Sequence, residues 1–176
     1  MSHFIYADHA ATTAVSDTAL QAMLPHFTTA YGNPSSLYRF AQEGKTDLER
    51  ARAEISACLN ARPEEIYFTS GGTEADNWAL RGVAELMALK GRKGGHIITS
   101  AIEHHAVLHT AQYLEKQGYE VTYLPVDGRG LVDPAALEGA IRPDTILISI
   151  MAANNEIGTI EPVAELGRIA RAHKVL

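Results

Sequence analysis

The chain has 176 residues, enough for one domain with an apolar core, and 46% of them are hydrophobic. The formal net charge of −6, from 15 Lys and Arg against 21 Asp and Glu, argues against general binding to nucleic acid or to a membrane surface, because both need a basic face. No apolar run reaches the roughly 18–20 residues that span a bilayer, and the first residues lack the pattern of a signal peptide, so we expect a cytoplasmic protein.

The first 60 residues contain an extended stretch, FIYADHAATT, then a predicted helix at 16–29, a loop, YGNPSSLYRF, and a second helix that ends near residue 60. This second helix carries the single cysteine, Cys58, so no disulfide can form within the chain. Cys58 falls at the edge of the apolar face formed by Leu48, Ala51, Ile55 and Leu59. We therefore interpret it as a small packed residue rather than a reactive thiol.

From residue 64 onward, short apolar runs alternate with amphipathic runs, as in a parallel sheet covered by helices. The pattern predicts strands at 65–69, 96–100, 120–125 and 145–151, and helices at 73–90, 104–117, 134–141 and 162–173. Asp133 and Pro134 provide an N-cap carboxylate and a proline at the first helical position, which favours a helix start there. The Asp127-Gly128 step predicts a turn.

The predicted helix at 162–173 is followed by KVL, which resembles the first step of a further strand. A finished domain usually ends with a completed element or a polar tail. We therefore expect the chain to stop within the fold.

A glycine pair, Gly71 and Gly72, connects an apolar run to a predicted helix that begins near Thr73. Glycines let a ligand approach the backbone, and the free N–H groups of a first helical turn favour anions. This arrangement suits a phosphate, with the Thr73 hydroxyl as an added donor. A plain turn capped by Ser70 is an equally good interpretation of the spacing.

Three histidines lie within six positions of the predicted helix at 104–117. At about 100° per residue, His104 shares the apolar stripe of Val107, whereas His105 and His109 project from the opposite face. No Cys, Asp or third His near this pair completes a tetrahedral set, so we expect no metal site. His104 instead follows the carboxyl end of a predicted strand, where open α/β sheets bind ligands. A satisfied core histidine is the alternative.

The segment at 149–162 carries Asn154, Asn155 and Glu156 just after the predicted strand at 145–151. Two amides and a carboxylate at the carboxyl end of a strand can orient a polar ligand, and a polar turn before Pro162 is the alternative. Together with the glycine turn and His104, these side chains would suit a phosphorylated heteroaromatic cofactor.

Five motifs in order, YADHAATTAV, YGNPSSLYRF, FTSGGTEADN, EHHAVL and NNEIGTI, resemble those of the cysteine desulfurases of the NifS and IscS group. These are pyridoxal-phosphate enzymes of the class V aminotransferase type. The resemblance runs from about Tyr6 to the last residue. It implies an α/β fold, a three-layer α/β/α arrangement with a mostly parallel sheet of the pyridoxal-phosphate-dependent transferase type. Residues 1–20 would be the N-terminal segment of the small domain, and residues 21–176 the N-terminal part of a truncated large cofactor-binding domain.

Carried over by position, the resemblance implies that Gly72 and Thr73 hold the phosphate of pyridoxal 5'-phosphate. His104 would stack on the pyridine ring, a contact of about 1 kcal/mol by analogy with aromatic pairs, and would serve as a catalytic residue in proton transfer. Asn155 would lie beside the cofactor and the substrate carboxylate.

The implied reaction converts L-cysteine to L-alanine and transfers sulfur to an enzyme thiol for iron-sulfur cluster assembly. The implied partners are a second copy in a homodimer and an iron-sulfur scaffold or another sulfur acceptor. The resemblance also implies that the lysine that binds the cofactor, the aspartate on its ring nitrogen and the acceptor cysteine lie outside this chain. We therefore expect the chain to be inactive alone. The alternatives are a non-catalytic binding module or half-enzyme that needs a complementary C-terminal chain, and another class V aminotransferase or a selenocysteine lyase.

Overall fold

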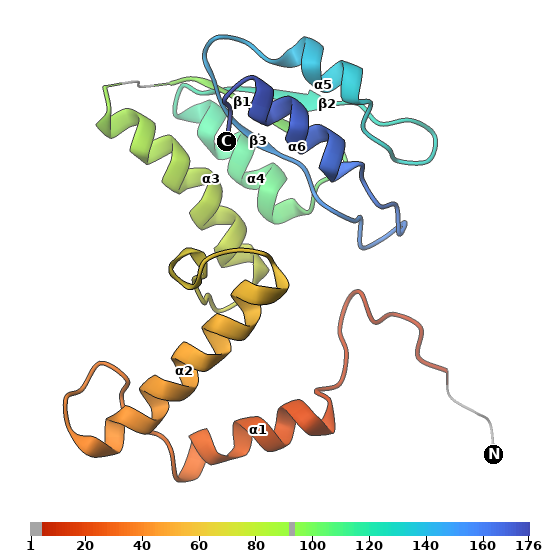
Figure 1. Ribbon diagram of the computed structural model, residues 1–176. Coiled ribbons are helices and arrows are strands. Elements are labelled where there is room, and N and C mark those ends of the chain that lie inside the picture. The colour runs from red at the N-terminus through yellow and green to blue at the C-terminus, as the bar shows by residue number, and fades with distance from the viewer. Residues whose placement is uncertain (1–4, 92–93) are drawn as a thin grey trace. The chain divides into compact units, whose positions relative to one another are not determined.

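The computed structural model describes residues 5–91 and 94–176, which form two compact units, Met1–Phe68 and Thr69–Leu176 (Figure 1). The first unit contains two helices, α1 (Asp17–Thr28) and α2 (Arg39–Cys58), and a short 3₁₀ turn, η1 (Pro63–Glu65). The predicted helix at 16–29 is therefore confirmed. Its start is fixed by Ser16, whose hydroxyl accepts a hydrogen bond from the Ala19 N–H at 3.2 Å.

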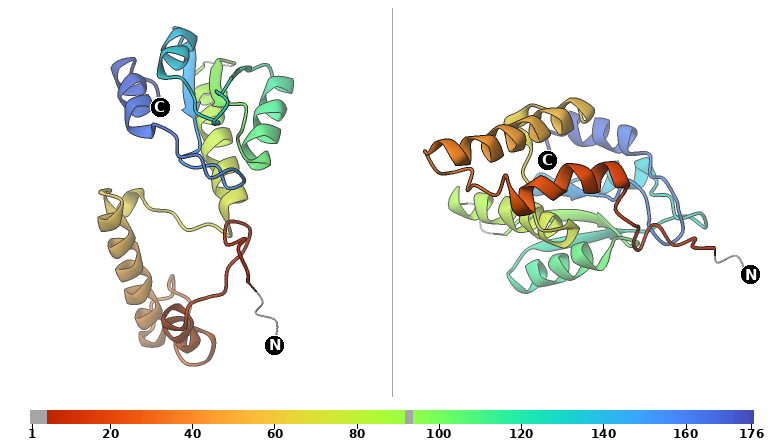
Figure 2. Two further views of the ribbon diagram at one scale, coloured as in Figure 1. Left: turned by 90° about the vertical axis from the view of Figure 1, so that its right-hand side faces the viewer. Right: turned by 90° about the horizontal axis from the view of Figure 1, so that it is seen from below.

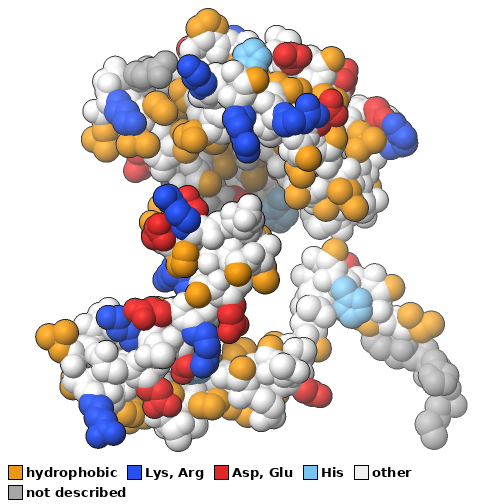
Figure 3. Space-filling model, in the orientation of Figure 1, with side chains coloured by type: hydrophobic (Ala, Val, Ile, Leu, Met, Phe, Trp, Pro, Cys, Tyr) orange, Lys and Arg blue, Asp and Glu red, His pale blue; other side chains and the backbone are white. Residues whose placement is uncertain are grey.

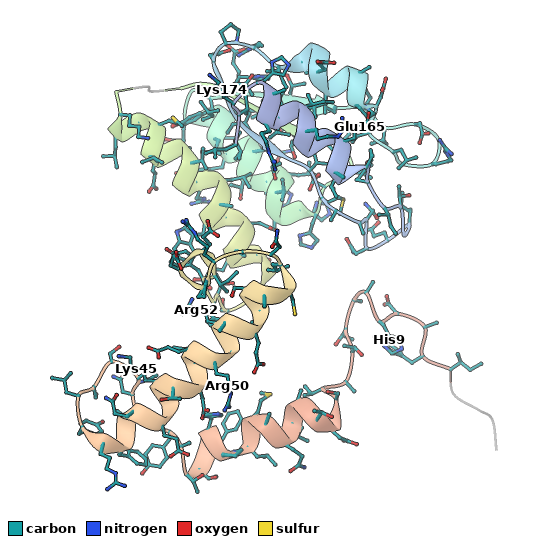
Figure 4. The ribbon with its side chains drawn as sticks, viewed as in Figure 1. His9, Lys45, Arg50, Arg52, Glu165 and Lys174 are labelled. Carbon is teal, nitrogen blue, oxygen red and sulfur yellow. The ribbon has the colours of Figure 1, made fainter. Side chains whose placement is uncertain are left out.

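The strand predicted at 65–69 is wrong. The chain forms η1 at Pro63–Glu65 and then continues to Thr69 without a strand partner among the described residues. The guanidinium of Arg52 on α2 donates to the carbonyl of Ile66 and lies 4.9 Å from the Phe68 ring centroid (Figure 4). Apolar β-branched and aromatic residues favour a strand only where a neighbouring ladder is available, and here a side chain binds the backbone instead.

The interpretation of Cys58 as a packed residue is also wrong, because Cys58 ends α2 and is exposed. Within the first unit, the buried residues of α2 are small, namely Ala41, Gly44 and Ser56, and they are not those of the predicted apolar face. A Cβ on Gly44 would lie 3.0 Å from the Gly32 carbonyl oxygen, so the helix approaches the preceding loop too closely for large residues. Hydrophobic side chains consequently remain at the surface (Figure 3).

The second unit is built on a parallel three-stranded sheet with the order β2-β1-β3. Its strands are β1 (His96–Ser100), β2 (Glu120–Leu124) and β3 (Thr145–Ser149), which confirms the remaining three predicted strands. In the register, Ile97 lies between Val121 and Leu147. At the free edge of β3, the N–H of Ile148 donates to the carbonyl of Leu176 at 2.8 Å, although residues 175–176 do not form a strand.

Helices cover both faces of this sheet and confirm the three-layer α/β/α arrangement (Figure 2). One face packs against α3 (Gly72–Leu89) and α4 (His105–Lys116), and the other against α5 (Pro134–Ala140) and α6 (Val163–Ala172). Ile97 and Ile98 face opposite layers, and both are fully buried. A central strand that is covered on both faces carries consecutive apolar residues rather than an alternating pattern, as Ile97 and Ile98 do here.

Local hydrogen bonds place the helices and turns where the sequence predicts them. Asp133 accepts from the Ala135 N–H at 2.9 Å and caps α5. Asp127 accepts from the N–H groups of Arg129 and Leu131, which closes the predicted turn. Among the helices of residues 5–91 and 94–176, none combines the length and apolarity needed to cross a bilayer.

Candidate functional site

The helices α3 and α4 begin at the same edge of the second unit, the edge where the parallel strands end. Near their starts, the Thr110 hydroxyl donates to Asn77 Oδ1 at 2.8 Å, and further along the Tyr119 hydroxyl donates to the Ala84 carbonyl at 2.8 Å. Asn77 also donates to the Thr73 carbonyl at 2.9 Å. The first turn of α3 is therefore held in place by α4.

The amino terminus of α3 is open. Gly71 occupies the N-cap position and has no side chain to cap the helix, and a Cβ on Gly71 or Gly72 would meet no atom within 4 Å. Among the described residues, no acceptor binds the N–H of Gly72 or Thr73. These donors can therefore face an anion without displacing a protein group.

Ser70 is not the helix cap that the alternative interpretation required. Its N–H and its hydroxyl both donate to Glu74 Oε2, at 2.6 and 2.7 Å. These two hydrogen bonds lower the pKa of Glu74, with the backbone donor as the larger cause. Glu74 is thus an ionised group in the first turn of α3, and its charge opposes a second anion there.

His104 lies at this edge, but not on the inward helix face that the sequence predicts. The helix α4 begins one residue later, and His104 is its exposed N-cap, with φ −58 and ψ 147. His104 has extended backbone angles and therefore lies outside the helix. The direction expected from a rotation of about 100° per helical residue does not apply to its side chain. Its Nδ1 accepts from the Ala106 N–H at 3.1 Å, so a neutral His104 carries its proton on Nε2.

His105 and His109 are exposed, as predicted, and their rings stack at a centroid distance of 5.1 Å. In the part of the chain that the structure describes, no group of three or more His, Cys, Asp or Glu side chains could hold a metal ion.

Asn154 and Asn155 follow β3 and differ sharply in burial. Asn154 is 9% exposed, and its Oδ1 accepts from the N–H groups of Glu156 and Ile157 at 2.8 and 3.0 Å. Asn155 is exposed, and its amide makes no hydrogen bond to any described residue. The buried amide therefore shapes the turn, and the neighbouring amide is left available to a ligand.

Glu103 is a feature of this edge that the sequence analysis missed. It is only 6% exposed, and its Oε1 accepts from the Ser100 hydroxyl at 2.7 Å and from the Met151 N–H at 2.8 Å. Burial raises the pKa of this carboxyl group, and the nearby Asp76 carboxylate of α3 acts in the same direction. An acidic residue three positions after the end of a buried strand is the sequence signal that could have identified it.

Comparisons with known proteins identify the family to which the chain is similar. The family model for aminotransferase class V matches residues 5–176. The chain is 53% identical to the cysteine desulfurase IscS of Clostridium botulinum (strain Kyoto / Type A2), covering 99% of this chain and 43% of that protein. It is 55% identical to the cysteine desulfurase IscS of Methanosarcina thermophila, covering 97% of this chain and 42% of that protein.

Solved structures with the same fold are similar to this chain. A NifS-like protein superposes with a TM-score of 0.89 at 44% identity, and the superposed region covers 94% of this chain and 45% of the NifS-like chain. The structure of SspA in complex with cysteine superposes with a TM-score of 0.91 at 39% identity, and the superposed region covers 96% of this chain and 48% of the SspA chain. The chain spans less than half the length of these relatives. On the family match and the shared fold, the chain belongs to the aminotransferase class V family.

Proposed function

We propose that this chain contributes the amino-terminal part of a pyridoxal-phosphate-dependent cysteine desulfurase. The observation that carries the proposal is the uncapped amino terminus of α3, which lies at the same sheet edge as His104 and Asn155. The named relatives are cysteine desulfurases, and one similar structure was solved with cysteine bound. Together these observations favour a site for a phosphorylated cofactor and a small amino acid.

The proposed reaction takes L-cysteine to L-alanine. The bond between Cβ and sulfur breaks, sulfur forms an S–S bond with an acceptor thiol, and Cβ gains a proton. The resulting persulfide would supply iron-sulfur cluster assembly through a scaffold or another acceptor protein. The enzyme would act as a homodimer, with residues 1–20 in its small domain and residues 21–176 in its large domain.

The residues at the edge fit the cofactor. The N–H groups of Gly72 and Thr73, with the Thr73 hydroxyl, offer donors to a phosphate at the positive end of a helix dipole. The exposed His104 ring offers a flat surface for a pyridine ring. When bound, pyridoxal phosphate supplies a conjugated ring that withdraws electrons from the substrate Cα.

The protein groups then have separable tasks. The donors of the α3 terminus would hold the phosphate, and the His104 ring would pack against the pyridine ring. The Nε2 of His104 is its remaining nitrogen, because Nδ1 is engaged by the Ala106 N–H, and it would hold or deliver a proton. The free Asn155 amide would donate to the substrate carboxylate.

The first experiment titrates the ¹⁵N-labelled chain with pyridoxal phosphate, inorganic phosphate and pyridoxal, and follows the amide signals of Gly72 and Thr73. Saturable shifts with both phosphate-containing ligands, and weaker shifts with pyridoxal, are expected. Shifts that are absent, or spread evenly over the surface, would contradict the phosphate site.

A further inference from the structure

We infer that two buried residues, Glu103 and Asn154, are positioning residues that fix His104 and Asn155 relative to each other. We call this pair, Glu103 and Asn154, the clamp. The inference rests on the proposed function of His104 and Asn155. Each clamp residue is buried and directly precedes one of them in the chain. Consecutive Cα atoms are about 3.8 Å apart, so an anchored residue restricts the position of its neighbour.

The clamp joins the two segments by two hydrogen bonds, and in both of them the segment after β3 donates and the segment after β1 accepts. Glu103 Oε1 accepts from the Met151 N–H at 2.8 Å, which ties the segment after β1 to the segment after β3. Asn154 Nδ2 donates to the Ile102 carbonyl at 2.9 Å, which ties the second segment back to the first. Two separate attachment points restrict sliding and rotation of one segment against the other.

Each clamp residue also organises its own segment. Glu103 Oε1 accepts from the Ser100 hydroxyl at 2.7 Å, at the last residue of β1, and so connects the segment to the rigid sheet. Asn154 Oδ1 accepts from the N–H of Glu156 at 2.8 Å and closes the turn that exposes Asn155. The groups proposed to contact the cofactor are thus exposed, whereas the groups that position them are buried.

The chemistry of the clamp suggests variants that separate its hydrogen bonds from its charge. Glu103 acts only as an acceptor in both contacts, so Glu103→Gln keeps a carbonyl oxygen at the same place and Glu103→Ala removes it. Asn154→Asp keeps the oxygen that accepts from Glu156 and removes the donor to Ile102. The matched control is His96→Gln, which alters a buried cross-strand contact at the other end of β1.

The test uses the chain without ligand and records the side-chain ¹⁵N signals of His104 and Asn155 and the exchange of the Ala106 amide. We expect Glu103→Ala and Asn154→Asp to shift both side-chain signals and to accelerate Ala106 exchange about tenfold, because the N-cap loses its support. Glu103→Gln and His96→Gln should stay close to the wild type. Unshifted signals in Glu103→Ala, or equally large shifts in His96→Gln, would overturn the inference. If Glu103→Ala does not fold, the signals of Asn154→Asp provide the test, and unshifted signals in that variant would overturn the inference.

A ligand titration tests the consequence for binding. We expect the affinity for pyridoxal phosphate to fall about tenfold in Glu103→Ala and to stay within about twofold of the wild type in Glu103→Gln. An unchanged affinity in Glu103→Ala would overturn the inference. Absence of binding by the wild-type chain would instead contradict the proposed function, and the ligand-free signals would still decide the inference about the clamp.

Discussion

At the scale of single residues, His104 has an observed role as the cap of α4 and a proposed role as a cofactor contact, and substitutions can separate the two. Its Nδ1 caps α4 through the Ala106 N–H, and its exposed ring is available to a ligand. Asparagine is a good N-cap but has no aromatic ring, and alanine has neither property. The pair His104→Asn and His104→Ala therefore distinguishes a structural cap from a cofactor contact.

We predict that His104→Ala lowers the free energy of unfolding by about 0.5–2 kcal/mol, whereas His104→Asn leaves it near the wild-type value. Both variants should bind pyridoxal phosphate more weakly, because both lack the ring. Urea denaturation and ligand titration measure the two effects. Wild-type affinity in His104→Asn would show that the ring does not contact the cofactor.

Glu74 gives a second prediction at this scale. Glu74→Gln keeps an oxygen that can accept from the Ser70 N–H and removes a negative charge from the first turn of α3. Inorganic phosphate should therefore bind a few-fold more tightly, with a larger effect at low ionic strength. The control is Glu85→Gln, an exposed position further along α3. Equal effects at the two positions would point to general electrostatics.

At the scale of elements, the strands that are buried on both faces were predictable, and the segment before α3 was not. β1 carries two consecutive β-branched apolar residues, Ile97 and Ile98, which face different layers, as expected for a parallel strand covered on both sides. The segment 65–69 has similar residues but lies where the Arg52 side chain, a long-range partner, binds its backbone. Likewise, the sequence indicated which residues follow the strands, but a one-residue difference in the start of α4 reversed the expected burial of His104.

The loops near the candidate site make a third prediction, at Gly130. This residue has φ +83, and an added Cβ would lie 2.6 Å from Ile157 Cδ1 in the loop after β3. Gly130→Ala should destabilise the chain by about 1–3 kcal/mol, mainly through strain of the backbone at positive φ, because the exposed tip of Ile157 can move aside. The matched variant Gly128→Ala, where a Cβ would meet nothing within 4 Å, should have little effect on thermal unfolding. Similar losses in both variants would contradict this explanation by backbone strain.

At the scale of the whole molecule, sequence patterns identify the α/β/α unit, whereas polar contacts between distant segments emerge only from the structure. His96 is the main example, with 1% of its surface exposed. Its Nδ1 lies 2.9 Å from Thr145 Oγ1, and its Nε2 lies 2.7 Å from Thr122 Oγ1, so the ring links all three strands. Its partners are 49 and 26 residues away, and no local periodicity relates such positions.

This contact predicts how stability depends on pH. Burial lowers the pKa of His96, with the nearby Arg142 acting in the same direction and Asp144 and Glu120 opposing it. The unfolded state therefore binds more protons than the folded state below about pH 6.5, and the stability contributed by His96 is lost as the pH falls through its folded pKa. The pKa of Glu103 is raised, so its effect on stability has the opposite pH dependence. The stability that Glu103 contributes is lost as the pH rises through its folded pKa.

A comparison of variants separates the pH effect of His96 from that of Glu103. The difference in unfolding free energy between the wild type and His96→Gln should shrink between pH 7.5 and pH 5, because glutamine does not titrate. Urea denaturation at steps of half a pH unit measures this difference, and His109→Gln controls for an exposed histidine. A difference that stays constant over this range would mean that His96 has the same proton affinity in both states, and that its two threonine contacts do not hold it neutral.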